Sequence, residues 1–319
     1  MTTSLLLGVD GGGTSTVAWL ADGQGKVIGK GIGGPSNVKA VGTELALAAL
    51  NGAIDQAFRN AQVSRQTVEI ACLGLAGFDR PEDRFQLEEW NAQSHWANRL
   101  ILANDGELII AAGTPGGWGL GVIAGTGSIA VGRTREGKVS RAGGWGPLLG
   151  DEGSGYAVAL SGLRMVVRRV DGRLPAPSTS VLADRLCRAL DIKDPSQLIA
   201  TLYSPSCDRT RIAALASEVV KAGELDAQVR TEILEPAGRE LAEAVAAVAR
   251  SLGWTNGPIP LGMAGGFILS SQVVSDSLLD HLRGLGYQPT TTRVDQPVLG
   301  AVMIALRHWQ QQDTNGQEA

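Results

Sequence analysis

Two glycine-rich turns, each directly after an apolar run, are the segments of this chain best suited to chemistry. The first is Asp10-Gly11-Gly12-Gly13-Thr14 and the second is Gly125-Thr126-Gly127-Ser128. Glycine permits positive φ and lets a ligand approach the main chain closely. Successive N–H groups in such a turn form a concavity that binds anions, and the hydroxyl side chains add donors. Both turns are therefore candidate phosphate-binding loops.

The two loops belong to a repeated pattern. Each is followed by a strand, a polar turn and a further strand that begins with a Lys-Val pair, Lys26-Val27 in the first copy and Lys138-Val139 in the second. Two similar units in one chain predict two similar half-domains facing each other, with a nucleotide clamped between the loops. A pair of glycine hairpins without a ligand is the alternative, but turn chemistry alone does not require the repeat.

The order of apolar runs and breakers predicts strands mixed with long helices, which indicates an α/β protein. Strands are expected at 5–9, 16–20, 26–32, 68–75, 100–103, 259–263 and 290–294. Helices are expected at 43–61, from 81 onward, and at 150–170, 180–190, 209–222, 224–252 and 272–285. A breaker-rich link at 113–117 separates an N-terminal half, residues 1–115, from a larger C-terminal half with helical insertions, residues 116–296. A last helix at about 297–312 is expected to pack back on the N-terminal half, and the polar tail from 311 is expected to fray.

Four candidate residues lie at the ends of expected strands: Asp10, Asp105, Gly125 and Gly265. Ligands of open α/β sheets bind beyond the carboxyl ends of the strands, so one cleft is expected to collect all four. A carboxylate such as Asp10 suits a Mg²⁺ ion that bridges phosphates through waters. A carboxylate fixed rigidly at a strand end also suits a general base.

Composition excludes several classes of protein. The net charge of the 319 residues is −4 and no long basic run occurs, so nucleic acid is not an expected partner. The three cysteines and three histidines are scattered, which gives neither a disulfide framework nor a zinc signature and fits a reducing cytoplasm. No stretch approaches transmembrane length, and the N-terminal apolar run is shorter than that of a signal peptide. A membrane partner is therefore not expected.

Taken together, four glycine-containing motifs resemble the N-acetylglucosamine kinase family, of the BadF/BadG/BcrA type, within the sugar kinase, actin and heat-shock chaperone ATPase superfamily. They are the two loops above, Gly143-Gly144-Trp145-Gly146 and Gly150-Asp151-Glu152-Gly153-Ser154. The resemblance spans nearly the whole chain, through Gly262-Met263-Ala264-Gly265-Gly266. It implies two ribonuclease-H-like (actin-like ATPase) domains with an active-site cleft between them, and ATP and Mg²⁺ as cofactors. It also makes a homodimer a candidate assembly.

The resemblance also implies a role for each matching residue. The ATP-binding residues would be Gly11, Gly12, Gly13, Thr14, Thr126, Gly127, Gly265 and Gly266. Asp10 would position Mg²⁺, and Asp105 would be the catalytic base. The sugar-binding residues would be Asn37, Asp105, Gly144, Trp145 and Asp151. The implied reaction is ATP-dependent phosphorylation of an amino sugar, N-acetylglucosamine first, to its 6-phosphate.

Four of these assignments have a structural alternative. Asp105 is also suited to N-cap the helix that follows it, and Asp151 to interact with the dipole of a nearby helix. Trp145 is of a type that often lies in a core, and Asn37 is a common turn residue.

Other functions share parts of the pattern. Glucosamine, glucose and N-acetylmannosamine remain alternative substrates. An activator ATPase of 2-hydroxyacyl-CoA dehydratases would need cysteines paired for an iron–sulfur cluster, and this chain lacks them. A non-catalytic switch that responds to ATP or sugar is the remaining class, and sugar-dependent release of ADP would separate it from a kinase.

Overall fold

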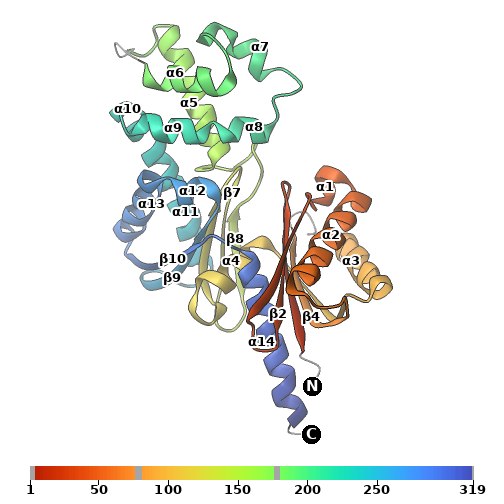
Figure 1. Ribbon diagram of the computed structural model, residues 1–319. Coiled ribbons are helices and arrows are strands. Elements are labelled where there is room, and N and C mark those ends of the chain that lie inside the picture. Colours follow the sequence, from red (N-terminus) through yellow and green to blue (C-terminus); the bar gives the residue numbers. More distant parts are fainter. Residues whose placement is uncertain (1–3, 76–80, 176–179, 318–319) are drawn as a thin grey trace. The chain divides into compact units, whose positions relative to one another are not determined.

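The computed structural model describes residues 4–75, 81–175 and 180–317, and it divides into two compact units (Figure 1). Unit 1 comprises Met1–Gly117 together with Gln296–Ala319, and unit 2 comprises Trp118–Asp295. Unit 1 is therefore assembled from both ends of the sequence, whereas unit 2 is continuous.

The sheet of unit 1 has five strands in the order β3-β2-β1-β4-β5. The strands are β1 (Leu5–Gly11), β2 (Thr16–Asp22), β3 (Val27–Gly33), β4 (Val68–Leu75) and β5 (Ala97–Ala103). The first three form an antiparallel meander, while β4 lies parallel to β1 and β5 parallel to β4. The carboxyl ends of β1, β4 and β5 consequently meet at one edge of the sheet.

Helices cover both faces of this sheet. They are α1 (Val38–Val41), α2 (Thr43–Ala61), α3 (Pro81–Ser94), α4 (Asp105–Gly113), the 3₁₀ turn Pro115–Gly117 and α14 (Val298–Gln317). On one face, Leu50, Ile54 and Phe58 of α2 join the core. On the other, α14 lies so close to β1 that a Cβ at Gly8 would stand 2.6 Å from the main-chain nitrogen of Val302. The last helix is thus an integral part of unit 1.

Unit 2 repeats the plan of unit 1, with the strand order β10-β9-β6-β7-β8. Its strands are β6 (Gly119–Ala124), β7 (Ser128–Arg133), β8 (Val139–Gly143), β9 (Gly257–Ala264) and β10 (Tyr287–Val294). The meander β6-β7-β8 is antiparallel, and β9 and β10 lie parallel to β6. The repeat and the α/β class expected from the sequence are confirmed.

The additional size of unit 2 lies in the connection from β8 to β9, where unit 1 has only α1 and α2. This connection holds α5 (Gly155–Val170), α6 (Val181–Leu190), the 3₁₀ turn Pro195–Gln197, α7 (Leu198–Leu202), α8 (Arg209–Ala214), α9 (Ala216–Gly223), α10 (Ala227–Val229), the π-helical turn Arg230–Leu234 and α11 (Glu235–Ser251). After β9 follow α12 (Gly266–Ser270) and α13 (Gln272–Gly284).

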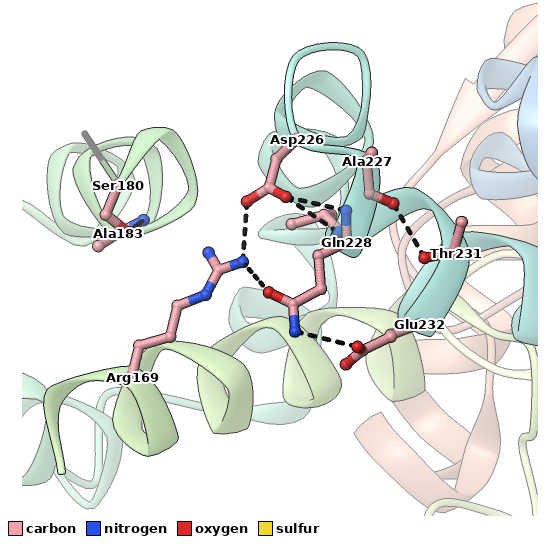
Figure 2. Close-up of polar contacts among 9 residues, drawn as sticks. Arg169, Ser180, Ala183, Asp226, Ala227, Gln228, Thr231 and Glu232 are labelled. Carbon is pink, nitrogen blue, oxygen red and sulfur yellow. Dashed lines mark hydrogen bonds and ion pairs between the residues drawn. The ribbon is translucent and has the colours of Figure 1, made fainter. Parts of the chain in front are cut away.

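A buried arginine joins two parts of this long connection. The Nη2 of Arg169 at the end of α5 donates to Asp226 Oδ2 at 3.0 Å and to Gln228 Oε1 at 2.8 Å (Figure 2). Gln228 in turn donates to Glu232 in the π-helical turn. The Arg169 side chain is only 4% exposed, so the network fixes α5 against the start of α10.

Several helices differ from the sequence-based expectation. The helix expected over 209–222 is divided at Leu215 into α8 and α9. The helix expected from 150 begins at Gly155 because Ser154 is its N-cap and accepts a hydrogen bond from the Ala157 N–H. The single helix expected over 224–252 starts at Ala227 and is interrupted by the π-helical turn. The last helix, expected to end near 312 with a frayed tail from 311, instead continues to Gln317.

Within the described ranges, every helix is too short or too polar to cross a membrane. All three cysteines lie in these ranges and carry free thiols.

Candidate active site

The carboxylates of Asp10 and Asp105 come to the same edge of the unit 1 sheet. The strand register places Asp10 beside Gly74 and Gly74 beside Ala103. Asp10, near the end of β1, thus lies in the same cross-strand row as Ala103, the last residue of β5. Asp105 starts α4 two residues after Ala103.

The electrostatics of Asp10 reflect this proximity. Burial, and to a smaller extent the negative charge of Asp105, together raise the pKa of Asp10 from 3.8 to about 6. Two carboxylates that repel each other in this way attract a divalent cation. No cluster of three potential metal-ligating residues occurs in the parts of the chain that the structure describes. Mg²⁺ suits such a site, because it is commonly held by one or two carboxylates together with the substrate phosphates.

Asp105 is not the N-cap of α4. Asn104 takes that position and accepts a hydrogen bond from the Glu107 N–H at 2.9 Å, while Glu107 Oε2 accepts from the Asn104 N–H. This capping box satisfies the helix start, so the helix-cap alternative for Asp105 is wrong. The Asp105 carboxylate accepts the Gly106 N–H at 2.9 Å, and a well-capped strand-to-helix junction holds it in place.

The first glycine loop is anchored at one end and open at the other. The Gly12 carbonyl accepts the N–H groups of Ser36 and Asn37, and a Cβ at Gly11 would collide with the Ser36 hydroxyl. A Cβ at Gly12 or Gly13 would meet no described atom within 4 Å. None of these glycines has a positive φ, so close approach, rather than backbone freedom, is the reason for glycine here.

Asn37 lies directly beside this loop and has a structural task. Its Oδ1 accepts the Lys39 N–H at 3.0 Å and caps the short helix α1. The structural alternative, an ordinary turn residue, thus holds for the side-chain oxygen of Asn37. A contact with a sugar stays a prediction for its amide group.

The second glycine loop follows β6 in unit 2 and is bound on one side to the segment before α5. The Gly125 carbonyl accepts the Gly155 N–H at 2.8 Å, and the Ser128 hydroxyl donates to the Glu152 carbonyl at 2.6 Å. Gly265 follows the neighbouring strand β9 with φ +101°, and its backbone lies against Ala124. Only glycine fits there, so Gly125 and Gly265 lie side by side at the carboxyl edge of this sheet.

Asp151 is buried beneath the second loop. Its Oδ1 accepts the Ser128 N–H at 3.2 Å, and its Oδ2 is ion-paired with the guanidinium of Arg209 in α8. Its backbone is left-handed at φ +62°, a conformation that aspartate tolerates better than most residues. Ser154, not Asp151, caps α5. Sequence analysis could not identify Arg209, because it lies 58 residues from Asp151 and in no recognisable motif.

Trp145 is not a core residue. Its side chain is 66% exposed, and the Arg141 guanidinium lies 5.4 Å from the centre of its ring. The preceding Gly144 has φ +71° and donates its N–H to the Ser128 carbonyl at 3.0 Å. The exposed indole is thus attached directly to the second glycine loop and can offer an apolar face to a ligand.

These features define a class of protein. Each unit carries the same five-stranded order, and in each the first strand ends in a glycine loop. This is the two-domain architecture of actin-like ATPases and sugar kinases, with candidate phosphate-binding and acid–base residues at the ends of its strands.

The chain belongs to the BadF/BadG/BcrA/BcrD ATPase family, whose model matches residues 7–305. It is 31% identical to an N-acetylmuramic acid/N-acetylglucosamine kinase of Clostridium acetobutylicum, over 94% of this chain and 97% of that protein. It is 30% identical to an N-acetyl-D-glucosamine kinase of Dictyostelium discoideum, over 96% of this chain and 99% of that protein.

A solved structure from Chromobacterium violaceum, named as a candidate N-acetylglucosamine kinase, is similar with a TM-score of 0.74 and 25% identity. The match covers 96% of this chain and 100% of that one. The family resemblance and the fold expected from the sequence are therefore confirmed.

Proposed function

We propose that this chain is an ATP-dependent sugar kinase that converts N-acetylglucosamine to its 6-phosphate. The observation that carries the proposal is the position of Asp105. It starts α4 at the end of β5, its charge acts on Asp10, and Asn104 rather than Asp105 caps the helix. An acidic residue that a helix cap does not explain, beside a second carboxylate and a glycine loop, suits phosphoryl transfer.

The chemistry assigned to this chain's residues follows. The oxygen of the sugar 6-hydroxyl forms a bond to the γ-phosphorus of ATP, and the bond from that phosphorus to ADP breaks. Asp105 accepts the proton that this hydroxyl loses. Backbone N–H groups within the segments 11–14 and 126–127 hold the phosphates and offset their charge. Asp10 would hold Mg²⁺ through waters, and the ion supplies further charge neutralisation when bound. Gly265 and Gly266 are assigned to the adenosine side.

The sugar is assigned to Asn37, Gly144, Trp145 and Asp151 together with Asp105. Sugar hydroxyls both donate and accept hydrogen bonds, which amides and carboxylates match. The exposed face of Trp145 suits an acetyl methyl group, whose burial is worth ~1 kcal/mol. A modest kcat/KM preference for N-acetylglucosamine over glucose, of about 10–200-fold, is expected from one such group. The names of the relatives add N-acetylmuramic acid to the glucosamine, glucose and N-acetylmannosamine to be screened.

The decisive variant is Asp105→Asn. An amide keeps the shape but cannot accept the hydroxyl proton, so kcat should fall by about 10²–10⁴-fold while ATP and sugar still bind. ADP release in a coupled assay gives the rate, and phosphorus NMR of the product gives the position of the phosphate. Asn98→Ala is the control: Asn98 is exposed at the opposite end of β5, so this substitution should leave kcat unchanged.

Near-normal turnover by folded Asp105→Asn would remove the base from the proposal. A 1-phosphate product, or no activity on any amino sugar, would favour another sugar kinase. ADP release that does not depend on sugar would favour the switch protein. The free thiols make a reducing cytoplasm the proposed location of the enzyme.

A further inference from the structure

Arg209 reaches the second glycine loop from a distant part of the sequence. It begins α8, within the long connection between β8 and β9. A Cβ placed on Gly127 would lie 2.6 Å from Arg209 Nη2 and 2.9 Å from Asp151 Oδ1. The guanidinium and its carboxylate partner therefore lie directly against the backbone of this loop.

Asp151 holds this guanidinium in place. The carboxylate side chain is 4% exposed, and its two oxygens are used by the Ser128 N–H and by Arg209. Arg209 is different, because its side chain is 40% exposed. A guanidinium has five N–H donors, and one ion pair uses only some of them.

A second buried pair in the same unit shows what a purely structural arginine looks like. Arg169 is 4% exposed, and its Nη2 bonds to both Asp226 and Gln228 (Figure 2). It joins two helices and borders no glycine loop. Arg209, in contrast, has a partly exposed side chain at a loop assigned to phosphates. Guanidinium groups bind phosphate oxygens through short, charge-assisted and commonly bidentate hydrogen bonds.

We propose that Arg209 binds the phosphates of ATP at loop 125–128, and that Asp151 is a positioning residue that aims it. The inference rests on the nucleotide half of the proposed function and not on the identity of the sugar. It gives the ion pair between Asp151 and Arg209 a role, the positioning of the guanidinium, that is separate from the proposed contact of Asp151 with the sugar. It also makes one helix of the inserted connection part of the nucleotide site.

The test compares ligands that differ in their number of phosphates. Calorimetry gives the affinity of the Mg²⁺ complex of AMPPNP, and ligand-observed NMR gives that of AMP, for wild type, Arg209→Gln, Arg209→Lys and Asp151→Asn. Arg211→Gln is the matched control, since Arg211 is an exposed cation on the same short helix. Arg209→Gln should weaken the binding of AMPPNP by about 10–100-fold, the range of a charged hydrogen bond, and leave the affinity for AMP unchanged.

Arg209→Lys should retain part of the affinity for AMPPNP. Asp151→Asn, like Arg209→Gln, should lower the ratio of the affinity for AMPPNP to the affinity for AMP. Arg211→Gln should behave as wild type. An unchanged ratio in Arg209→Gln, or an equal loss of AMPPNP and AMP, would overturn the proposal and leave a structural ion pair. Wild type that binds AMPPNP but phosphorylates no sugar would refute the kinase and leave this test valid.

Discussion

Asp10 carries a carboxylate in surroundings that disfavour its charge. Burial, and then Asp105, raise its pKa to about 6 from 3.8. The folded chain therefore binds more protons than the unfolded chain between these values, and stability should decrease as the pH rises from about 4 to about 6. Above pH 6 the cost persists, and two pKa units correspond to at most about 3 kcal/mol.

Asp10→Asn removes this cost and should raise the melting temperature of the ligand-free protein at pH 8, but not at pH 3.5. Scanning calorimetry in the presence of a chelator measures both. The same variant should use Mg²⁺·ATP poorly, and wild-type activity should decline as the pH falls through about 6, where Asp10 becomes protonated. An equal shift in melting temperature at both pH values would show that the carboxylate is not the source of the cost.

Gly11 and Gly12 should respond differently to a side chain, although they are neighbours. A Cβ at Gly11 collides with Ser36, whereas one at Gly12 meets nothing within 4 Å. Gly11→Ala should therefore lower stability, by the 1–3 kcal/mol typical of overpacking. Gly12→Val should leave the melting temperature unchanged and abolish tight ATP binding in calorimetry. Tight binding by Gly12→Val would contradict a phosphate cradle at this loop.

Among the elements, the junction of α5 with α10 depends most on a single side chain. Arg169→Leu would leave the carboxylate of Asp226, which is 14% exposed, without its cation, and breaking a buried pair commonly costs about 3–5 kcal/mol. Chemical denaturation of unit 2 should show this loss. Arg168→Leu, at the exposed neighbouring position, is the control and should change stability by less than about 0.5 kcal/mol. Equal effects of both substitutions would mean that the network in Figure 2 contributes little.

Local pattern predicted most of the elements, and tertiary interactions determined the rest. Helix α2 matches its expected range of 43–61, because its apolar spacing and flanking glycine are local signals. The short helix α1 had no periodicity to reveal it, and the π-helical turn at Arg230–Leu234 leaves none in the sequence.

The candidate site divides in the same way. The glycine loops are contiguous motifs and could be found from the sequence. The capping role of Asn104 was a local signal that we attributed to its neighbour Asp105. The pairing of Asp151 with Arg209 needs the folding of the whole β8–β9 connection, and no spacing rule predicts it. Residue types thus indicated which groups could do chemistry, but not which groups hold them.

At the scale of the whole molecule, unit 1 depends on the last helix of the chain. Val298, Ala301, Val302 and Ala305 of α14 complete the core that contains Leu6 and Cys72. A chain that ends at Asp295 should therefore lose hydrogen-exchange protection and protease resistance in unit 1, and all kinase activity, while unit 2 stays protected. The control is truncation after Gln312, which leaves these contacts in place. Protected β1 and β4 amides in the shorter chain would show that unit 1 does not need α14.

The discontinuity of unit 1 has a consequence for its synthesis on the ribosome. The segment up to Gly117 cannot complete its core when it emerges, because helix α14 is translated only after unit 2. Unit 2 is continuous and can fold before unit 1 receives helix α14. At typical rates of 5–20 residues per second the delay is about 10–40 s, during which the face of β1 and β4 that α14 covers stays open. We therefore expect the nascent N-terminal half to be the part of this protein that recruits chaperones.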